Sequence, residues 1–136
     1  MDRFVLHERL AADTAPLADW ALSRVLVMND ARFAWLVLVP RRAGLGELHD
    51  LTHAEALVLI EELKRASAAL KRVTGAAKIN IGALGNLVPQ LHIHVVARNP
   101  GDAAWPGPVW GHGKPVPYAA AARQDLLDRL AADLRS

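Results

Sequence analysis

The sequence contains no cysteine, few aromatic residues and no long uncharged run of apolar residues. The absence of cysteine excludes disulfide bonds, thiolate metal sites and a cysteine nucleophile. No apolar stretch approaches the roughly eighteen uncharged residues that a membrane-spanning helix needs. The first residues, Met1 to Phe4, lack the basic-then-apolar pattern of a secretory signal. We therefore expect a cytoplasmic protein with no membrane partner.

An excess of charge of one sign is also absent. The 136 residues include 16 lysines and arginines against 14 aspartates and glutamates, for a formal net charge of +2. So small an excess does not suit a protein that coats nucleic acid, and no nucleic-acid partner is expected. Because there is no internal repeat and no low-complexity linker, residues 1–136 are predicted to form a single domain.

Four apolar or alternating runs predict strands. Arg24–Met28 and Phe33–Val39 flank a short polar break, which is the pattern of an antiparallel hairpin. Two further strands are predicted over 78–83 and 90–97. Residues 100–117 are rich in proline and glycine and are expected to be irregular.

Two segments have helical periodicity. Thr52 and Glu55 have the spacing of a capping box, and apolar residues that include Leu57, Ile60 and Leu63 follow at helical intervals. This pattern predicts an amphipathic helix over about 52–74, ended by Gly75. A second helix, over about 119–134, places four leucines on one face. Strands joined by short turns, with helices between them, predict an α+β domain with an antiparallel sheet.

The last predicted strand carries a polar stripe. Alternation along a strand places Gln90, His92 and His94 on one face. Imidazoles that titrate near pH 7 can act as a nucleophile, as a general acid or base, or as metal ligands. The same alternation also occurs on an ordinary solvated strand. A zinc site is a further alternative, for which the sequence offers no third ligand at a diagnostic spacing.

The segment before this strand, residues 80–89, contains two glycines and two asparagines. Glycine lets backbone N–H groups approach an anion closely, and asparagine side chains can donate to phosphate or sugar oxygens. An ordinary hairpin loop uses the same residue types as turn formers. Directly before a His-x-His strand, however, the segment indicates phosphoryl chemistry.

These residues resemble the histidine triad (HIT) superfamily, whose motif is His-x-His-x-His-x-x with x apolar. Gln90-Leu91-His92-Ile93-His94-Val95-Val96 matches this motif at every position except the first histidine, which is Gln90. The lead-in from Asn80 to Val88 and the hairpin that ends in Pro40-Arg41-Arg42 resemble the corresponding parts of the family. The similarity covers about residues 22–98.

The resemblance implies a HIT-like fold, with a five-stranded antiparallel sheet, one long central helix and a C-terminal helix, usually paired as a homodimer. It implies a nucleotide hydrolase or transferase that attacks the α-phosphate of a purine nucleotide unit and forms a nucleotidyl-histidine. Candidate substrates are diadenosine polyphosphates such as diadenosine tetraphosphate, phosphoramidates and adenylated molecules. No metal site and no cofactor are required, although a divalent cation can accompany the substrate phosphates.

The resemblance also assigns roles to residues. His92 matches the family's nucleophile, and His94 matches the histidine that bonds phosphate oxygens. Asn29 and Asp30 fall where the family contacts the ribose hydroxyls. The residues that match the cradle of the α-phosphate are Asn80, Gly85, Asn86, Leu87 and Val88.

Three positions depart from the family pattern. Gln90 cannot shuttle a proton as an imidazole can, although its amide could orient His92 or bond a phosphate oxygen. Leu87 occupies a position that is commonly serine or threonine, and Trp35 falls near a strand position where many members carry another histidine. These departures leave open a second function, a nucleotide-binding protein with little or no turnover. The loop from Ala104 to His112, with its two tryptophans, is expected either to pack on the sheet or to form a lid.

Overall fold

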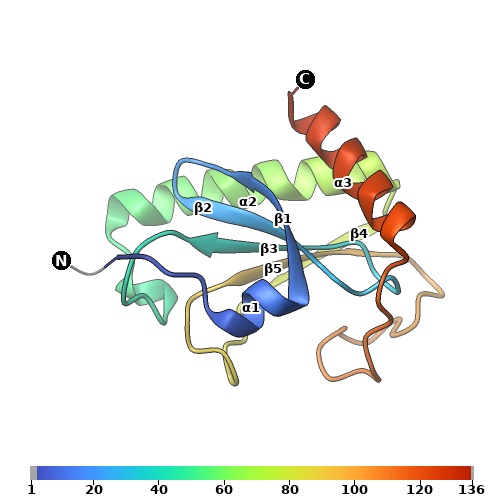
Figure 1. Cartoon of the computed structure of the whole chain (residues 1–136), viewed down its shortest axis with the longest axis horizontal. Coiled ribbons are helices and arrows are strands. Elements are labelled where there is room, and N and C mark those ends of the chain that lie inside the picture. The colour runs from blue at the N-terminus through green and yellow to red at the C-terminus, as the bar shows by residue number, and fades with distance from the viewer. Residues whose placement is uncertain (1–2, 136) are drawn as a thin grey trace.

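A five-stranded antiparallel sheet in the order β1-β2-β3-β5-β4 forms the centre of the molecule (Figure 1). The computed structural model describes residues 3–135. It confirms the predicted α+β fold and the predicted hairpin, which is β2 paired with β3. The strands are β1 (Thr14–Asp19), β2 (Ser23–Met28), β3 (Trp35–Pro40), β4 (Lys78–Gly82) and β5 (Ile93–Arg98).

The helices are α1 (Glu8–Asp13), α2 (His53–Thr74) and α3 (Ala120–Arg135), together with a short 3-10 turn, Leu48–Asp50. The caps predicted for α2 are confirmed. The side chain of Thr52 accepts from the backbone N–H of Glu55, and the Glu55 side chain accepts in return from Thr52. Gly75 ends the helix at φ 69°, a left-handed conformation that favours glycine. None of the helices that the structure describes is long and apolar enough to cross a membrane.

Apart from the short 3-10 turn, two elements of the described fold were not predicted. The first, β1, contains Pro16 and a bulge between Pro16 and Ala18, so its sequence lacks the alternation of a regular strand. It lies at an edge of the sheet, where a proline is tolerated because the missing N–H faces away from the ladder. The second, α1, has only six residues, too few to show a helical period.

The sheet separates two apolar cores. On one face Val25, Leu36, Ile93 and their alternating neighbours pack against α2 and α3. Figure 1 shows α2 running along the sheet with α3 close to it. On the other face Leu26, Val37 and Val96 pack with a second set of residues, which comes from α1, from the start of β3 and from the loops: Leu10, Phe33, Trp35, Val88, Ala104 and Val109. The candidate site lies on this second face.

The apolar stripe of α2 differs in part from the predicted one. Leu63 and Leu70 are buried as expected, but Leu57 and Ile60 are 58% and 55% exposed. The helix instead packs through a neighbouring stripe that includes Leu59 and Ala66, which has the same helical period. Apolar residues therefore lie on two sides of α2, and only one of these sides faces the core.

A buried carboxylate fastens α2 to the sheet. Glu62 is only 6% exposed, and its two oxygens accept from the backbone N–H groups of Leu22 (2.9 Å) and Ser23 (3.1 Å). Ser23 is the first residue of β2. The helix side chain thus completes the hydrogen bonds of the turn between β1 and β2, which would otherwise be buried without partners.

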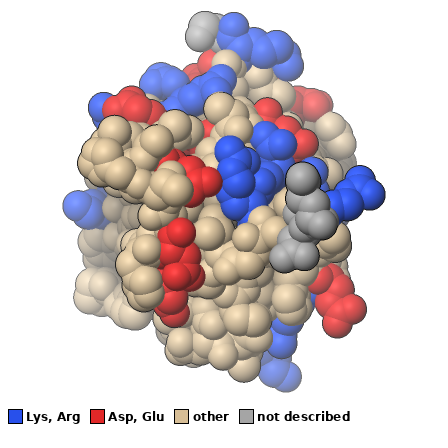
Figure 2. Space-filling view, turned by 90° about the vertical axis from the view of Figure 1, so that its left-hand side faces the viewer, with Lys and Arg blue, Asp and Glu red and all other residues tan. Residues whose placement is uncertain are grey.

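Charged side chains of both signs alternate at the end of the molecule where α2 begins (Figure 2). Basic side chains gather near the middle of this face, with acidic ones around them. Arg42, which follows β3, pairs with Glu55 in the first turn of α2 at 3.1 Å. Opposite charges at such short range reduce each other's field, so this face forms no continuous basic surface.

Replacing Glu62 by glutamine tests the role of this carboxylate in the fold. Glu62→Gln turns one acceptor into an N–H group that must face a backbone N–H, so we expect the free energy of unfolding to fall by about 1–3 kcal/mol. Urea unfolding followed by circular dichroism measures this loss. The exposed Glu61→Gln variant serves as control and should change stability by less than about 0.5 kcal/mol. Equal stability of the two variants would contradict the assigned role.

Candidate active site

A cavity of about 320 Å³ opens on the face of the sheet away from α2. His92 and His94 lie in its wall, together with Trp35 from β3 and Trp110 from the loop between β5 and α3. The helix α1 and the segment that precedes β5 supply a further part of the wall: Arg9, Leu10, Asp13, Leu84, Gly85, Asn86, Leu87 and Val88. The remaining wall residues come from the end of β2, the turn after it and the loop before α3: Met28, Asp30, Arg32, Val109, Gly111, His112, Gly113 and Pro115. The structure thus brings both motif histidines and most of the predicted phosphate cradle to one cavity.

His92 lies immediately before β5 and is 6% exposed. Its ring Nδ1 is 2.6 Å from the backbone carbonyl oxygen of Gln90. A carbonyl oxygen can only accept, so Nδ1 carries the proton and donates it. In the neutral ring this leaves a lone pair on Nε2, the form of imidazole that acts as a nucleophile.

His94, the second residue of β5, is 5% exposed. Its Nδ1 atom accepts a hydrogen bond, whereas that of His92 donates one. Its Nδ1 lies 2.9 Å from the indole Nε1 of Trp35, which donates the hydrogen bond. Burial, and to a smaller extent the neighbouring His92, lower the pKa of His94 to about 4. At neutral pH His94 is therefore an uncharged ring.

The two imidazoles form a compact group with the surrounding indoles. The ring centres of His92 and His94 are 5.0 Å apart, with the planes at 75°. Trp35 and Trp110 each meet His94 edge to face, at 5.5 Å and 5.6 Å. His94 thus has an aromatic ring on three sides, which excludes water and explains the low pKa.

Gln90 does not point into the cavity. Its amide Nε2 donates to the carbonyl of Val5 (2.9 Å), and its Oε1 accepts from the backbone N–H of His7 (2.8 Å). The prediction that Gln90 shares one strand face with His92 and His94 is therefore wrong. The strand β5 begins only at Ile93, so the alternation of a strand does not extend back to Gln90. The backbone of Gln90 orients His92, whereas its side chain holds the N-terminal segment.

That segment leads directly into the wall of the cavity. His7 caps α1, since its Nδ1 accepts from the backbone N–H of Arg9 at 3.0 Å. Arg9, Leu10 and Asp13 of α1 all line the cavity. By fixing the backbone just before α1, Gln90 sets the position of this helix over the site.

The predicted cradle is only partly assembled in the cavity. Gly85, Asn86, Leu87 and Val88 all line it, and Gly85 has φ 68°, a left-handed conformation that glycine adopts readily. Leu87 is 77% exposed, so it offers apolar surface where the resemblance implies a hydroxyl. Asn80 is not in the wall of the cavity.

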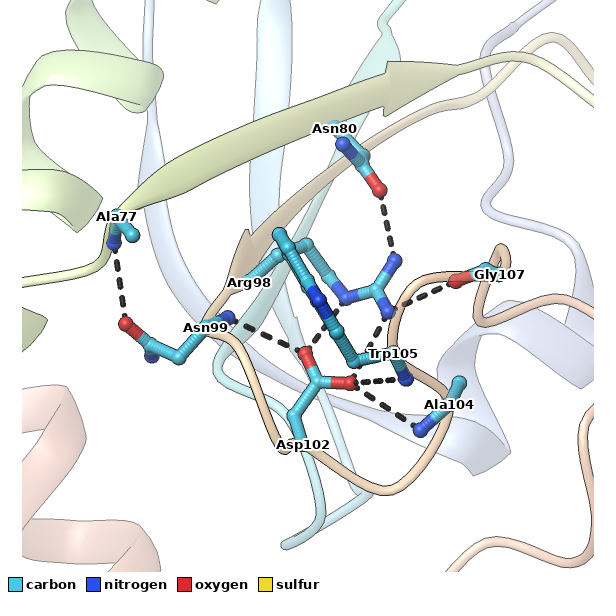
Figure 3. A network of polar contacts seen from close by, with 8 residues as sticks. All are labelled: Ala77, Asn80, Arg98, Asn99, Asp102, Ala104, Trp105 and Gly107. Atoms are coloured by element: carbon cyan, nitrogen blue, oxygen red, sulfur yellow. Dashed lines mark hydrogen bonds and ion pairs between the residues drawn. The ribbon is translucent and has the colours of Figure 1, made fainter.

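Asn80 belongs instead to a buried network around Arg98 (Figure 3). Its Oδ1 accepts from Arg98 Nη1 at 2.8 Å. Arg98, 2% exposed, also donates to both carboxylate oxygens of Asp102 (2.8 and 3.0 Å) and to the carbonyl of Gly107 (2.8 Å). These bonds hold the pKa of Asp102 well below its usual range. The network ties β4 and β5 to the loop that carries Trp105 and Trp110.

Of the two residues predicted to contact the ribose, only Asp30 lines the cavity. Asn29 Oδ1 accepts from the backbone N–H of Tyr118 at 2.9 Å, and the residue does not line the cavity. Asp30 does line it and is 1% exposed. Its carboxylate accepts from the side chain and backbone of Arg32 and from the backbone N–H of Val116. Burial alone would raise the pKa of Asp30, but these hydrogen bonds outweigh burial and hold it low.

Sequence reasoning missed Arg32 in this site and left open whether the loop from Ala104 to His112 packs on the sheet or forms a lid. Trp110 is part of the wall and packs so closely on β4 that a Cβ at Gly82 would lie 2.9 Å from its ring. Arg32 lies two residues after Asp30, and this short spacing was the available signal. The described residues contain no group of three or more His, Cys, Asp or Glu side chains that could hold a metal ion.

Comparisons with known proteins identify the family of the chain. The family model for the HIT domain matches residues 11–101. No curated protein matches the chain. The solved structures that resemble it include a histidine triad protein of Bradyrhizobium japonicum, 47% identical, with 98% of this chain and 99% of that one covered and a TM-score of 0.95.

Two further histidine triad structures are similarly close. One is from Sinorhizobium meliloti 1021, 46% identical, with 96% of each chain covered and a TM-score of 0.94. The other is from Marinobacter aquaeolei VT8, 43% identical, with 98% of each chain covered and a TM-score of 0.95. Given a family model that spans most of the chain and relatives this similar over their full length, the chain belongs to the HIT domain family of histidine triad proteins.

Proposed function

We propose that the chain is a nucleotide hydrolase or transferase that attacks the α-phosphate of a substrate containing a purine nucleoside monophosphate. HIT family proteins are nucleotide-binding and hydrolase-type proteins. The observation that carries the proposal is the 2.6 Å contact between His92 Nδ1 and the Gln90 carbonyl. It places a proton on Nδ1, so that the neutral ring carries its lone pair on Nε2, in the wall of the cavity.

The proposed reaction has two displacements. In the first, the Nε2 lone pair of His92 forms a bond to the α-phosphorus, and the bond from phosphorus to the leaving-group oxygen breaks. The leaving group departs with the bonding electrons and takes up a proton from solvent or from its own phosphate. In the second, water attacks the nucleotidyl-histidine, the P–N bond breaks, and the nucleoside monophosphate is released with regeneration of His92. In-line transfer of this kind depends mainly on positioning and on donors around the phosphate oxygens.

The cavity wall supports a phosphate-containing ligand. Arg9 and Arg32 line it, and Asp30 offers a carboxylate oxygen, Oδ2, that accepts one hydrogen bond from the residues that the structure describes, namely from Arg32. A carboxylate oxygen can accept more than one, so Oδ2 can also accept from a ribose hydroxyl. A diadenosine polyphosphate is the substrate class we propose. No cofactor takes part, and a divalent cation would arrive with the substrate phosphates. The proposed location is the cytoplasm.

A second candidate is a nucleotide-binding protein with little turnover. It is favoured by Gln90, which cannot titrate and whose amide bonds the backbone of Val5 and His7, so no proton shuttle stands at the first position of the motif. The two candidates share the cavity and differ in whether His92 forms a covalent intermediate. Product analysis separates them.

We also propose that a second copy of the chain covers the edge strand β4. Ile81 of β4 and Ile60 of α2 are 50% and 55% exposed, and an apolar groove runs between these elements. An edge strand with exposed apolar side chains is a site for pairing unless another chain covers it. A homodimer joined at β4 would continue the sheet from one copy to the next.

The first prediction concerns His92. Incubation of the wild type with diadenosine tetraphosphate should give AMP and ATP by chromatography, whereas His92→Ala should lose roughly a thousandfold or more of kcat because the nucleophile is gone. AMP binding, measured by calorimetry, should persist in the variant. His49→Ala, whose side chain is 84% exposed and outside the cavity, is the matched control. Similar turnover by His92→Ala and wild type would exclude the mechanism, and binding of AMP without any product would favour the second candidate.

The second prediction concerns Gln90. Gln90→His restores the family's first histidine, yet an imidazole cannot meet both Val5 and His7 with the parallel geometry of an amide. We expect stability to fall by about 1 kcal/mol, AMP affinity to fall several-fold, and kcat not to rise. Gln124→His, on the exposed face of α3, is the control. A clear gain in kcat would show that Gln90 is a degraded catalytic position and not an anchor.

The third prediction concerns the oligomeric state. Sedimentation equilibrium should give a dimer for the wild type and a monomer for Ile81→Lys, because a buried lysine in the shared sheet edge would be desolvated without a partner. Val116→Lys, equally exposed at 50% but remote from β4, should remain dimeric. A monomeric wild type, or a dimeric Ile81→Lys, would rule out this interface.

A further inference from the structure

Trp35 makes the only hydrogen bond from the described residues to the His94 ring. It is the first residue of β3 and is 7% exposed. In the sheet register Trp35 pairs with Val96, so His94 is its diagonal neighbour on β5. The indole Nε1 reaches His94 Nδ1 at 2.9 Å. The residue that departs from the family pattern therefore contacts the site's second histidine directly.

The direction of this hydrogen bond is fixed by chemistry. An indole N–H can only donate, so the Nδ1 atom of His94 must present its lone pair. A neutral imidazole has one ring proton, which must then lie on Nε2. His92 is the reverse case, because the Gln90 carbonyl can only accept and requires the proton on Nδ1.

The two adjacent rings therefore offer complementary groups to the cavity. His92 presents a lone pair on Nε2, and His94 presents an N–H on Nε2. Both residues line the cavity, and neither Nε2 atom bonds to a residue that the structure describes. A reacting phosphate needs one nucleophile and, on an adjacent side, a donor to an equatorial oxygen.

We propose that Trp35 is a positioning residue, whose indole N–H locks neutral His94 in the Nε2–H form so that it donates to a non-bridging oxygen of the α-phosphate. This inference rests on the proposed function for its ligand, but the tautomer that it assigns exists in the free protein. Without the indole N–H, the ring of His94 could exchange its proton between nitrogens or turn. A lone pair would then face the phosphate oxygens and repel them.

The indole is itself held in place. Phe33 and Trp110 meet Trp35 edge to face at 6.3 Å and 6.4 Å. Trp110 also packs against His94 and closely on Gly82 of β4. Rings packed on several sides cannot turn without disturbing the core, so the direction of the Trp35 N–H is well defined.

Nitrogen NMR of the histidine rings tests the assignment directly, since protonated and unprotonated ring nitrogens resonate far apart. In wild type at pH 7, His94 should show an unprotonated Nδ1 and a protonated Nε2, whereas His92 should show a protonated Nδ1. A proton on His94 Nδ1 in wild type would overturn the proposal without any variant. This measurement needs no turnover, so it remains decisive even if the proposed reaction does not occur.

Trp35→Phe then removes the N–H while keeping an aromatic ring. We expect His94 to populate both tautomers and kcat to fall about ten- to a hundredfold, the usual effect of losing a group that orients an active-site ligand, with KM changed much less. Trp110→Phe removes an indole N–H that has no hydrogen-bond partner among the described residues, and should leave the His94 tautomer unchanged. An unchanged tautomer in Trp35→Phe, or a changed tautomer with unchanged kcat, would overturn the proposal.

Discussion

The alternation of side chains along β5, a strand paired on both sides, determines where the parts of the site can lie. Ile93 and its alternating neighbours face α2, and the burial of that face fixes the register of the strand. His94, Val96 and Arg98 must then face the opposite side. His94 lines the cavity, Val96 packs in the second core, and Arg98 forms the network that holds the following loop. A shift by one residue would exchange all of them with the apolar set.

Burying two imidazoles and a guanidinium on one sheet face is unfavourable unless each polar atom finds a partner. Arg98 is satisfied by Asp102, by Asn80 and by a backbone carbonyl. The two histidines are satisfied only in part within the protein, since each has one ring nitrogen bonded to another residue and the other directed at the cavity. The same partners that make burial tolerable also fix what each ring offers to a ligand.

Local signals explain which parts of the fold could be predicted. The caps of α2, the alternation of β5 and the hairpin of β2 and β3 depend on residues close together in the chain. The motif and the segment before it also predicted which residues would lie together, since His92, His94 and the loop from Gly85 line one cavity. The direction of the Gln90 amide was not predictable, because its partners are more than 80 residues away in sequence.

Contacts between residues far apart in the sequence also explain the other differences between the prediction and the structure. Asn80 has the sequence context of a phosphate contact, but Arg98, eighteen residues later, lies beside it in the paired strands and takes its side-chain oxygen. Trp35 looks like the loss of a polar group until β3 and β5 are placed in register, where its N–H meets His94. In both cases the residue type was visible in the sequence and its partner was not.

Trapping the covalent intermediate tests the central claim most directly. The wild type is mixed with diadenosine tetraphosphate labelled at the α-phosphate, quenched in alkali, which preserves a phosphorus–nitrogen bond, and digested for mass analysis. A nucleotidyl group on His92 during turnover is the predicted result. Steady product formation with no labelled protein at any quench time, or a label on another residue, would contradict a mechanism in which His92 is the nucleophile.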